Sequence, residues 1–302
     1  MIVLRFTALL LAACATCTWA QHAERSLQRG GTFIEPPARV DPLYLPVGPN
    51  QPAGSQEPTV QLRLGADLPL SRGTPVGSGA QGAPSGSPTA QASIRWRPVR
   101  TDHWYVHATF FHYFDPARQR PWNPDFTYGF GWDTGKPGSW SFGYANYTGT
   151  RLGSQASARR FNFPQGQWSA SYRFELPASL ERVFLAGDGD SAMCNAGANL
   201  VPRYTRLARG SPGRDKVSLA LGCRYQRPDG FFAHATLLAW PRAGTQQPWD
   251  PDYVYGFGWT GPGGLTIQYA NYSGNRLFGR ERAPGQGRLE NGSVSIGWAT
   301  AW

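Results

Sequence analysis

The sequence predicts an all-β fold, an antiparallel transmembrane β-barrel of about twelve strands built from two duplicated six-strand halves. Three observations predict it. Apolar and polar residues alternate with a period of two from residue 59 onward, which is typical of strands with two different faces. Long and short connections alternate between these strands. Most phrases of residues 59–177 also return in similar form within residues 178–302.

The N-terminal residues 1–20 have the pattern of a secretory signal peptide. Arg5 provides the positive start, an apolar stretch follows, and small residues flank a cleavage position after Ala20. The segment LAAC also resembles a bacterial lipoprotein signal in which Cys14 is lipidated, so the two kinds of processing both stay open. Residues 21–58 are Pro-rich and lack periodicity, and we expect an extended or disordered periplasmic leader there.

Segments with strand periodicity fill the rest of the chain, and none shows a helical period. Their approximate spans are 59–70, 91–99, 103–114, 126–133, 139–147, 168–176, 180–187, 216–226, 231–240, 252–260, 264–273 and 291–302. No later apolar run is long enough for a transmembrane helix, whereas strands of about ten tilted residues can cross a bilayer. The connections predict a short PAS turn after the sixth segment and a very long loop over 188–215 after the seventh. A membrane barrel has short turns at its periplasmic end and long loops at the outer end.

The internal repeat is strongest in two aromatic-glycine phrases. WNPDFTYGFGW occupies residues 122–132, and WDPDYVYGFGW occupies residues 249–259. Other matched phrases keep an offset of 124 to 127, such as WSFGYANYTGTRL and LTIQYANYSGNRL. A six-stranded half could not close alone around a filled interior, so residues 59–302 are expected to form one barrel domain.

Alternation assigns the side chains of these phrases to the two faces of the wall. The residues expected to face lipid are Phe126, Tyr128, Phe130, Trp132, Tyr253, Tyr255, Phe257 and Trp259. The residues expected to face inward are Thr127, Gly129, Gly131, Val254, Gly256 and Gly258. Inward glycines can relieve crowding where a small barrel bends. Alternatively, the leader or a ligand approaches the wall closely at these positions.

Two equivalent polar pairs are candidates for the lumen. In VHATF and AHATL, alternation places His107, Thr109, His234 and Thr236 inside. They can be part of a satisfied polar interior, a pore constriction or an acid–base pair. A His with a hydroxyl two residues later superficially resembles a nucleophile and its base. The hydroxyl belongs to Thr and faces the lumen, so we assign no catalytic residue.

The YANYTGTR and YANYSGNR phrases run from the membrane to the outer rim. Tyr144 and Tyr269 are expected to anchor the outer lipid interface. The rim candidates for anion binding are Asn146, Arg151, Asn271 and Arg276. Guanidinium groups suit phosphate binding, whereas the same residue types also anchor loops. Both interpretations stay open.

The cysteines and the charge limit the chemistry. Outside the signal peptide the chain has only Cys194 and Cys223, which favours one disulfide in an exported protein; two unpaired thiols are the alternative. No His or Cys lies at ligand spacing nearby, so neither a metal nor a cofactor is expected. The net charge of +10 comes almost wholly from Arg and favours anionic lipid or acidic glycan. Export makes nucleic acid an unexpected partner.

The C-terminal segment VSIGWATAW ends the chain on an aromatic residue. Its residues on one face are Val294, Ile296, Trp298, Thr300 and Trp302. The pattern resembles the β-signal of bacterial outer-membrane barrels, except that Thr300 stands where that class usually has an apolar or aromatic residue. The resemblance implies the outer membrane as location. Its implied partners are the assembly machinery, which would recognise the C-terminal strand, and outer-membrane lipid with lipopolysaccharide.

These observations lead to three functional hypotheses. The first is a channel or export conduit for small or oligomeric solutes, with anionic solutes as one candidate class. The alternative is a structural or accessory barrel with an occluded lumen, which acts through its loops or its leader. A lipid-modifying enzyme of the outer membrane is the least favoured.

Overall fold

A computed structural model describes most of the region expected to form the barrel. The described ranges are 59–70, 88–99, 103–116, 124–146, 166–176, 189–205, 214–242, 250–271 and 289–302, with the shorter pieces 150, 152, 163, 180, 187, 245–246 and 275–277. The expected signal peptide and leader, residues 1–58, lie outside the described residues. Within the described ranges, no helix has the length and apolar character needed to cross a membrane.

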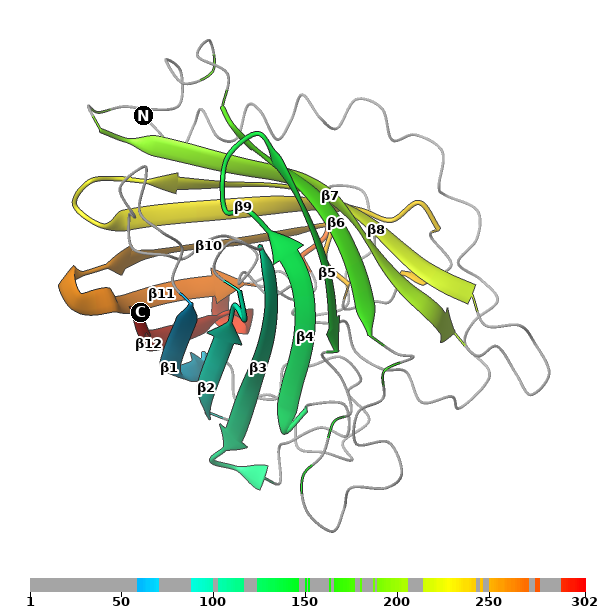
Figure 1. The fold of residues 1–302 in the computed structure, drawn as a ribbon, viewed down its shortest axis with the longest axis horizontal. Coiled ribbons are helices and arrows are strands. Elements are labelled where there is room, and N and C mark those ends of the chain that lie inside the picture. Colours follow the sequence, from blue (N-terminus) through cyan, green and yellow to red (C-terminus); the bar gives the residue numbers. More distant parts are fainter. Residues whose placement is uncertain are drawn as a thin grey trace.

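The described residues form a closed antiparallel sheet of twelve strands (Figure 1). The strands are β1 (Val60–Pro69), β2 (Thr89–Trp96), β3 (Trp104–Tyr113), β4 (Phe126–Asp133), β5 (Ser139–Asn146), β6 (Gln167–Glu175), β7 (Ser191–Thr205), β8 (Arg214–Gln226), β9 (Phe231–Ala239), β10 (Tyr253–Thr260), β11 (Leu265–Asn271) and β12 (Ser293–Ala301). Each strand pairs with its neighbours in sequence, and β1 pairs with β12 to close the ring. The predicted twelve-stranded antiparallel barrel is therefore confirmed.

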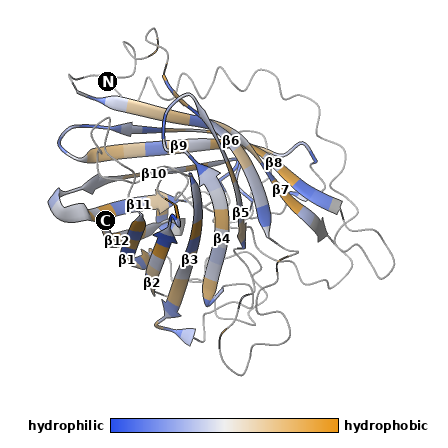
Figure 2. Cartoon of the chain, in the orientation of Figure 1, coloured by the Kyte–Doolittle hydropathy of each residue, from blue (hydrophilic) through white to orange (hydrophobic). Residues whose placement is uncertain are grey.

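The outer face of the wall is apolar, and exposure alternates along the strands. On β3, Val106 and Phe110 are 42% and 49% exposed, whereas Tyr105 and Thr109, the residues that precede them, are buried. Hydrophobic and hydrophilic residues likewise alternate along the strands in Figure 2. Exposed apolar residues on other strands include Leu64, Ile94, Trp140, Phe142, Trp168, Leu219, Leu221, Ile267, Ile296 and Trp298. A closed sheet with such a face satisfies its backbone internally and presents apolar surface to lipid.

The two ends of the barrel differ in the length of their connections. The short-turn end carries the connections 97–103, 134–138, 227–230 and 261–264. The opposite, long-loop end carries 70–88, 114–125, 147–166, 240–252 and 272–292. Both ends of the barrel chain lie at the short-turn end, where the N–H of Val60 donates to the carbonyl of Trp302 over 2.9 Å.

The prediction for the seventh strand is wrong. We expected it at 180–187, but β7 is Ser191–Thr205. The connection 176–190 is therefore long although it lies at the short-turn end, and the connection 206–213 replaces the expected loop over 188–215. The reason is that the outward positions of β7 are mostly small, including Ala192, Cys194, Ala196 and Ala198. The alternation of apolar and polar residues along β7 is consequently weaker than the apolar pattern at 180–187, where we expected the strand.

A disulfide joins the two longest strands. Cys194 on β7 lies directly opposite Cys223 on β8, and the two sulfur atoms are bonded at 2.07 Å. Cys223 is two residues from the exposed, outward Leu221, so the bond is on the outer face of the wall. The predicted disulfide is confirmed.

Candidate functional site

The predicted lumen residues lie on the inner face of opposite walls. Along β9, His234 and Thr236 are buried, while the alternate residues Ala233 and Ala235 face outward. On β3, His107 and the buried Thr109 occupy the same inner face, where Thr109 hydrogen bonds to Ser93 over 2.8 Å. The strands β3 and β9 are six places apart in the ring of twelve, so the two histidines belong to opposing sides of the interior. Their functional role stays a prediction.

The inward glycines of the repeated phrase make room for the histidine rings. His107 lies opposite Gly129 in the register, and His234 lies opposite Gly256. A Cβ on Gly129 would come within 2.5 Å of His107 Cε1, and a Cβ on Gly256 within 2.5 Å of His234 Nε2. No side chain could be added at either glycine without displacing atoms. Of the two interpretations given to these glycines, the contacts fit the relief of crowding inside the wall.

An arginine stands beside each histidine, on the strand before it. Arg95 of β2 is directly opposite His107, and Arg224 of β8 is directly opposite His234. Each guanidinium covers an aromatic ring at cation–π distance: Arg95 lies 3.7 Å from the ring centroid of Tyr105, and Arg224 lies 3.9 Å from that of Phe232. We call these groups the first unit (Arg95, Tyr105, His107 and Gly129) and the second unit (Arg224, Phe232, His234 and Gly256).

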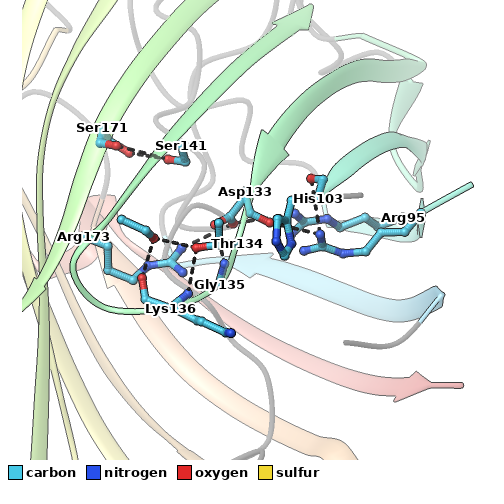
Figure 3. A network of polar contacts seen from close by, with 11 residues as sticks. Arg95, His103, Asp133, Thr134, Gly135, Lys136, Ser141, Ser171 and Arg173 are labelled. Atoms are coloured by element: carbon cyan, nitrogen blue, oxygen red, sulfur yellow. Dashed lines mark hydrogen bonds and ion pairs between the residues drawn. The ribbon is translucent and has the colours of Figure 1, made fainter. Parts of the chain in front are cut away.

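The first unit has a carboxylate within reach. Figure 3 shows Asp133, the last residue of β4, between Arg95 and Arg173. Its Oδ2 atom is 3.6 Å from a nitrogen of Arg95 and 3.4 Å from a nitrogen of Arg173. Arg97 donates to the backbone carbonyls of Asp133 and His103 over 3.0 and 3.3 Å. Two guanidinium groups thus share the Asp133 carboxylate, and a third is held by the backbone carbonyl of the same residue.

The second unit differs at the position that corresponds to Asp133. Thr260 follows Gly256 by the same four residues that separate Asp133 from Gly129, and its hydroxyl pairs with that of Thr266 at 3.2 Å. Arg224 is only 6% exposed, and no ion pair joins it to an acidic group among the described residues. Its charged neighbour is Arg63, which points inward from β1 and repels it electrostatically.

The inner wall toward the short-turn end is therefore strongly basic. Its described arginines are Arg63, Arg95, Arg97, Arg173 and Arg224. The Asp133 carboxylate pairs with Arg95 and Arg173, and Glu175 lies exposed at the end of β6. Sequence reasoning missed this cluster, although a signal was present: an inward Arg precedes an outward aromatic residue in IRW (94–96), YRF (172–174) and CRY (223–225).

The rim candidates make internal contacts. Asn146 and Asn271 are completely buried, and Arg276 is 9% exposed. Arg276 forms an ion pair with Asp252 at 3.2 Å, and the Nδ2 group of Asn275 donates to Asn271 Oδ1 over 3.2 Å. Arg151 lies outside the described residues. Anion recognition by these rim residues stays a prediction.

Two carboxylates fasten the connections at the long-loop end. Asp252 accepts from the backbone N–H of Leu277 over 3.1 Å and from Gln246 Nε2 over 2.8 Å. Asp125 likewise accepts from the backbone N–H of Leu152 over 2.8 Å. Both carboxylates follow a Pro of the repeated phrase. Each ties the start of a strand to a distant connection.

The expectation that Tyr144 and Tyr269 contact the lipid interface is wrong. Tyr144 is completely buried and Tyr269 is 9% exposed. The hydroxyl of Tyr144 donates to the carbonyl of Phe163 over 2.7 Å, and that of Tyr269 donates to the carbonyl of Leu289 over 2.8 Å. The ring of Phe163 also stacks on Tyr144 with 4.4 Å between centroids. Residues of the following connection therefore fold down over both rings.

Comparison with known proteins adds solved structures only. No family model matches the chain, and no curated protein matches it by sequence. The translocator domain of autotransporter NalP from Neisseria meningitidis is 14% identical over 80% of this chain and 88% of that chain, with a TM-score of 0.35. Salmonella typhi OmpF, in a complex with daunomycin, is 8% identical over 80% of this chain and 96% of that chain, with a TM-score of 0.31.

Proposed function

We propose that the protein is a bacterial outer-membrane barrel that passes small or oligomeric solutes and prefers anions to cations. The observation that carries the proposal is the basic inner wall, where Arg63, Arg95, Arg97, Arg173 and Arg224 outnumber the carboxylates near them. A passage lined by one sign of charge within low-dielectric walls concentrates ions of the opposite sign. Twelve strands leave space for a narrow aqueous lumen.

The proposed location is supported by several features of the chain. The barrel is closed, its outer face is apolar, and both of its chain ends lie at the short-turn end, which is the periplasmic end of bacterial barrels. The expected signal peptide and the C-terminal strand agree with export. Contacts with lipopolysaccharide and with the assembly machinery belong to the same proposal. The origin of the barrel by duplication of a six-strand half is also part of the proposal, and it is supported by the repeated phrases of the sequence.

Planar-bilayer recording of the refolded chain tests the passage. In a salt gradient we expect discrete openings and a reversal potential on the anion-selective side. The double variant Arg95→Gln with Arg224→Gln should shift that potential toward zero, because each change removes a positive charge from the inner wall. Arg227→Gln is the matched control, since Arg227 is 51% exposed in the β8–β9 turn and pairs with Asp229 at 3.0 Å. It should leave the potential nearly unchanged.

Three results would count against the proposal. Cation selectivity of the unmodified chain would contradict the charge argument. If neither the full chain nor a chain lacking residues 21–58 conducts ions, the accessory barrel with an occluded lumen would be favoured instead. Lipid hydrolysis that is lost in His107→Ala or His234→Ala would favour the enzyme hypothesis.

A further inference from the structure

We propose that Arg224, His234 and Asn195 form a binding site for one oxyanion group of a solute: a phosphate, sulfate or carboxylate. The proposal deepens the anion passage and rests on it for access of the solute. The three residues come from the adjacent strands β7, β8 and β9. His234 is directly opposite Arg224, and Asn195 is opposite Gly222, two positions before Arg224 on the same inner face. Arg224 is thus the direct cross-strand neighbour of His234 and a diagonal neighbour of Asn195, and side chains in such positions are close enough to meet the same ligand.

Each of the three side chains has a buried polar atom without a protein partner. These atoms are Nε of Arg224, Nε2 of His234 and Oδ1 of Asn195, and none has a hydrogen bond within the described part of the chain. Arg224 and His234 are each 6% exposed. Buried polar atoms are nearly always hydrogen-bonded, because leaving them unpaired is costly. Arg95 and Arg173 near the first unit also have such atoms, but there Asp133 balances their charge. The three atoms on inward positions of β7, β8 and β9 have no such countercharge among the described residues, which indicates a site for a partner that the chain does not supply.

The charge around the site indicates that this partner is an anion. A buried guanidinium normally has a carboxylate beside it, because an unpaired buried charge is strongly unfavourable. In the first unit Asp133 supplies that carboxylate at 3.6 Å from Arg95. In the second unit the corresponding residue is the neutral Thr260. Arg63 adds a second positive charge that repels Arg224, and an anion between the two would relieve this repulsion.

The donor set suits an oxyanion. A guanidinium donates two parallel N–H bonds to carboxylate, phosphate or sulfate oxygens. The Nε2 atom of His234 lies over Gly256 of β10, and from that side it can carry a proton and donate a further bond. The Asn195 amide offers its carbonyl oxygen to a hydroxyl of the solute, or its NH₂ group to the anion after a half-turn of the amide. The site therefore recognises the anionic group and a neighbouring hydroxyl together.

Titration calorimetry of the full chain in non-ionic detergent tests the site without requiring conductance. Inorganic phosphate, sulfate and acetate serve as probes, and the tightest of them identifies the preferred group. Arg224→Gln should weaken binding of that probe by roughly 10-fold or more, the loss expected for charge-assisted hydrogen bonds. Arg95→Gln is the matched control, because Arg95 occupies the equivalent place beside an internal carboxylate, and it should change the affinity less than about 3-fold. Heat-modifiable gel mobility confirms folding of each variant.

A second variant keeps Arg224 and supplies the missing carboxylate. Thr260→Asp places in the second unit the acid that Asp133 provides in the first, so it should abolish binding of the probe and raise resistance to unfolding. This variant decides the outcome if Arg224→Gln does not fold. The proposal is overturned if Thr260→Asp binds like the unmodified chain, if Arg95→Gln weakens binding as much as Arg224→Gln, or if no probe binds. If the barrel is anion-selective but binds no probe, only this binding site is refuted. If it binds the probe but does not conduct ions, only the proposed anion passage is refuted.

Discussion

Replacement of the inward glycines that face the histidines should destabilise the barrel. In Gly256→Ala, the added methyl group would lie 2.5 Å from His234 Nε2 and 2.6 Å from the carbonyl oxygen of Tyr269. Gly129→Ala repeats the conflict, with His107 Cε1 at 2.5 Å and the carbonyl oxygen of Tyr144 also in contact. The two variants therefore test one packing arrangement on opposite walls.

The expected magnitude follows from how far the neighbours must move. Ordinary contacts of a Cβ begin at 3.4 Å, so each methyl group displaces its neighbours by almost 1 Å. Overpacking of this kind costs about 1–3 kcal/mol in free energy of unfolding. The histidine ring can swing away, but the backbone carbonyl is part of the sheet. His234→Ala in the Gly256→Ala background should therefore recover only part of the loss.

The assay is urea unfolding in detergent, followed by tryptophan fluorescence and by the separation of folded and unfolded forms on unboiled gels. The matched control is Gly297→Ala on β12, because the nearest atom to its added Cβ is the carbonyl oxygen of Leu64 at 3.4 Å. Alanine there should be neutral or stabilise by about 0.4–1 kcal/mol, since it restricts the unfolded chain. The reasoning is refuted if Gly256→Ala and Gly297→Ala unfold at the same urea concentration.

Three further changes test the contacts that hold the wall and its connections. Asp252→Asn should lower the free energy of unfolding in urea by about 3–5 kcal/mol, because it leaves Arg276 buried without its countercharge. In the double variant with Arg276→Gln, the total loss should be smaller than the sum of the losses of the two single variants. Tyr144→Phe should cost about 0.5–1.5 kcal/mol, because one hydrogen bond to the following connection is lost, and limited proteolysis at the long-loop end should become faster. Reduction of Cys194–Cys223, which are 29 positions apart, should lower stability by about 2–4 kcal/mol. The Asp252–Arg276 ion pair is contradicted if the losses of the two substitutions simply add. The Tyr144 contact is contradicted if proteolysis of Tyr144→Phe is unchanged, and the stabilisation by the disulfide is contradicted if the urea midpoint is unchanged after reduction.

Period-two alternation predicted the architecture and the faces of the wall because both depend on local pattern. The outward Ile296 and Trp298 of the last strand, and the inward His234 of β9, follow from alternation alone. The disulfide followed from counting the cysteines of a chain that we expected to be exported. These predictions required no knowledge of which strand lies beside which.

The features that depend on register were beyond the sequence pattern. That Arg224 lies opposite His234, and that Thr260 replaces the carboxylate found at Asp133, becomes visible only when strands are aligned. β7 was misplaced because its outward residues are small, although GANL at 197–200 resembles GADL at 65–68 of β1. Tyr144 was misjudged because a connection, which alternation does not describe, covers its ring.

The seam between β1 and β12 limits how this barrel can fold. It pairs Gln61 with Ala301, and Val60 with Trp302 through two backbone hydrogen bonds, so the first and last strands of the barrel are neighbours. Contacts between residues so distant in sequence form slowly, because a very long loop must close first. Until β12 has paired with β1, the edge strands have unpaired backbone groups that can pair with other chains. The barrel therefore has no closed state before β12 pairs with β1, and the unfolded polypeptide must be kept from pairing with its copies until then.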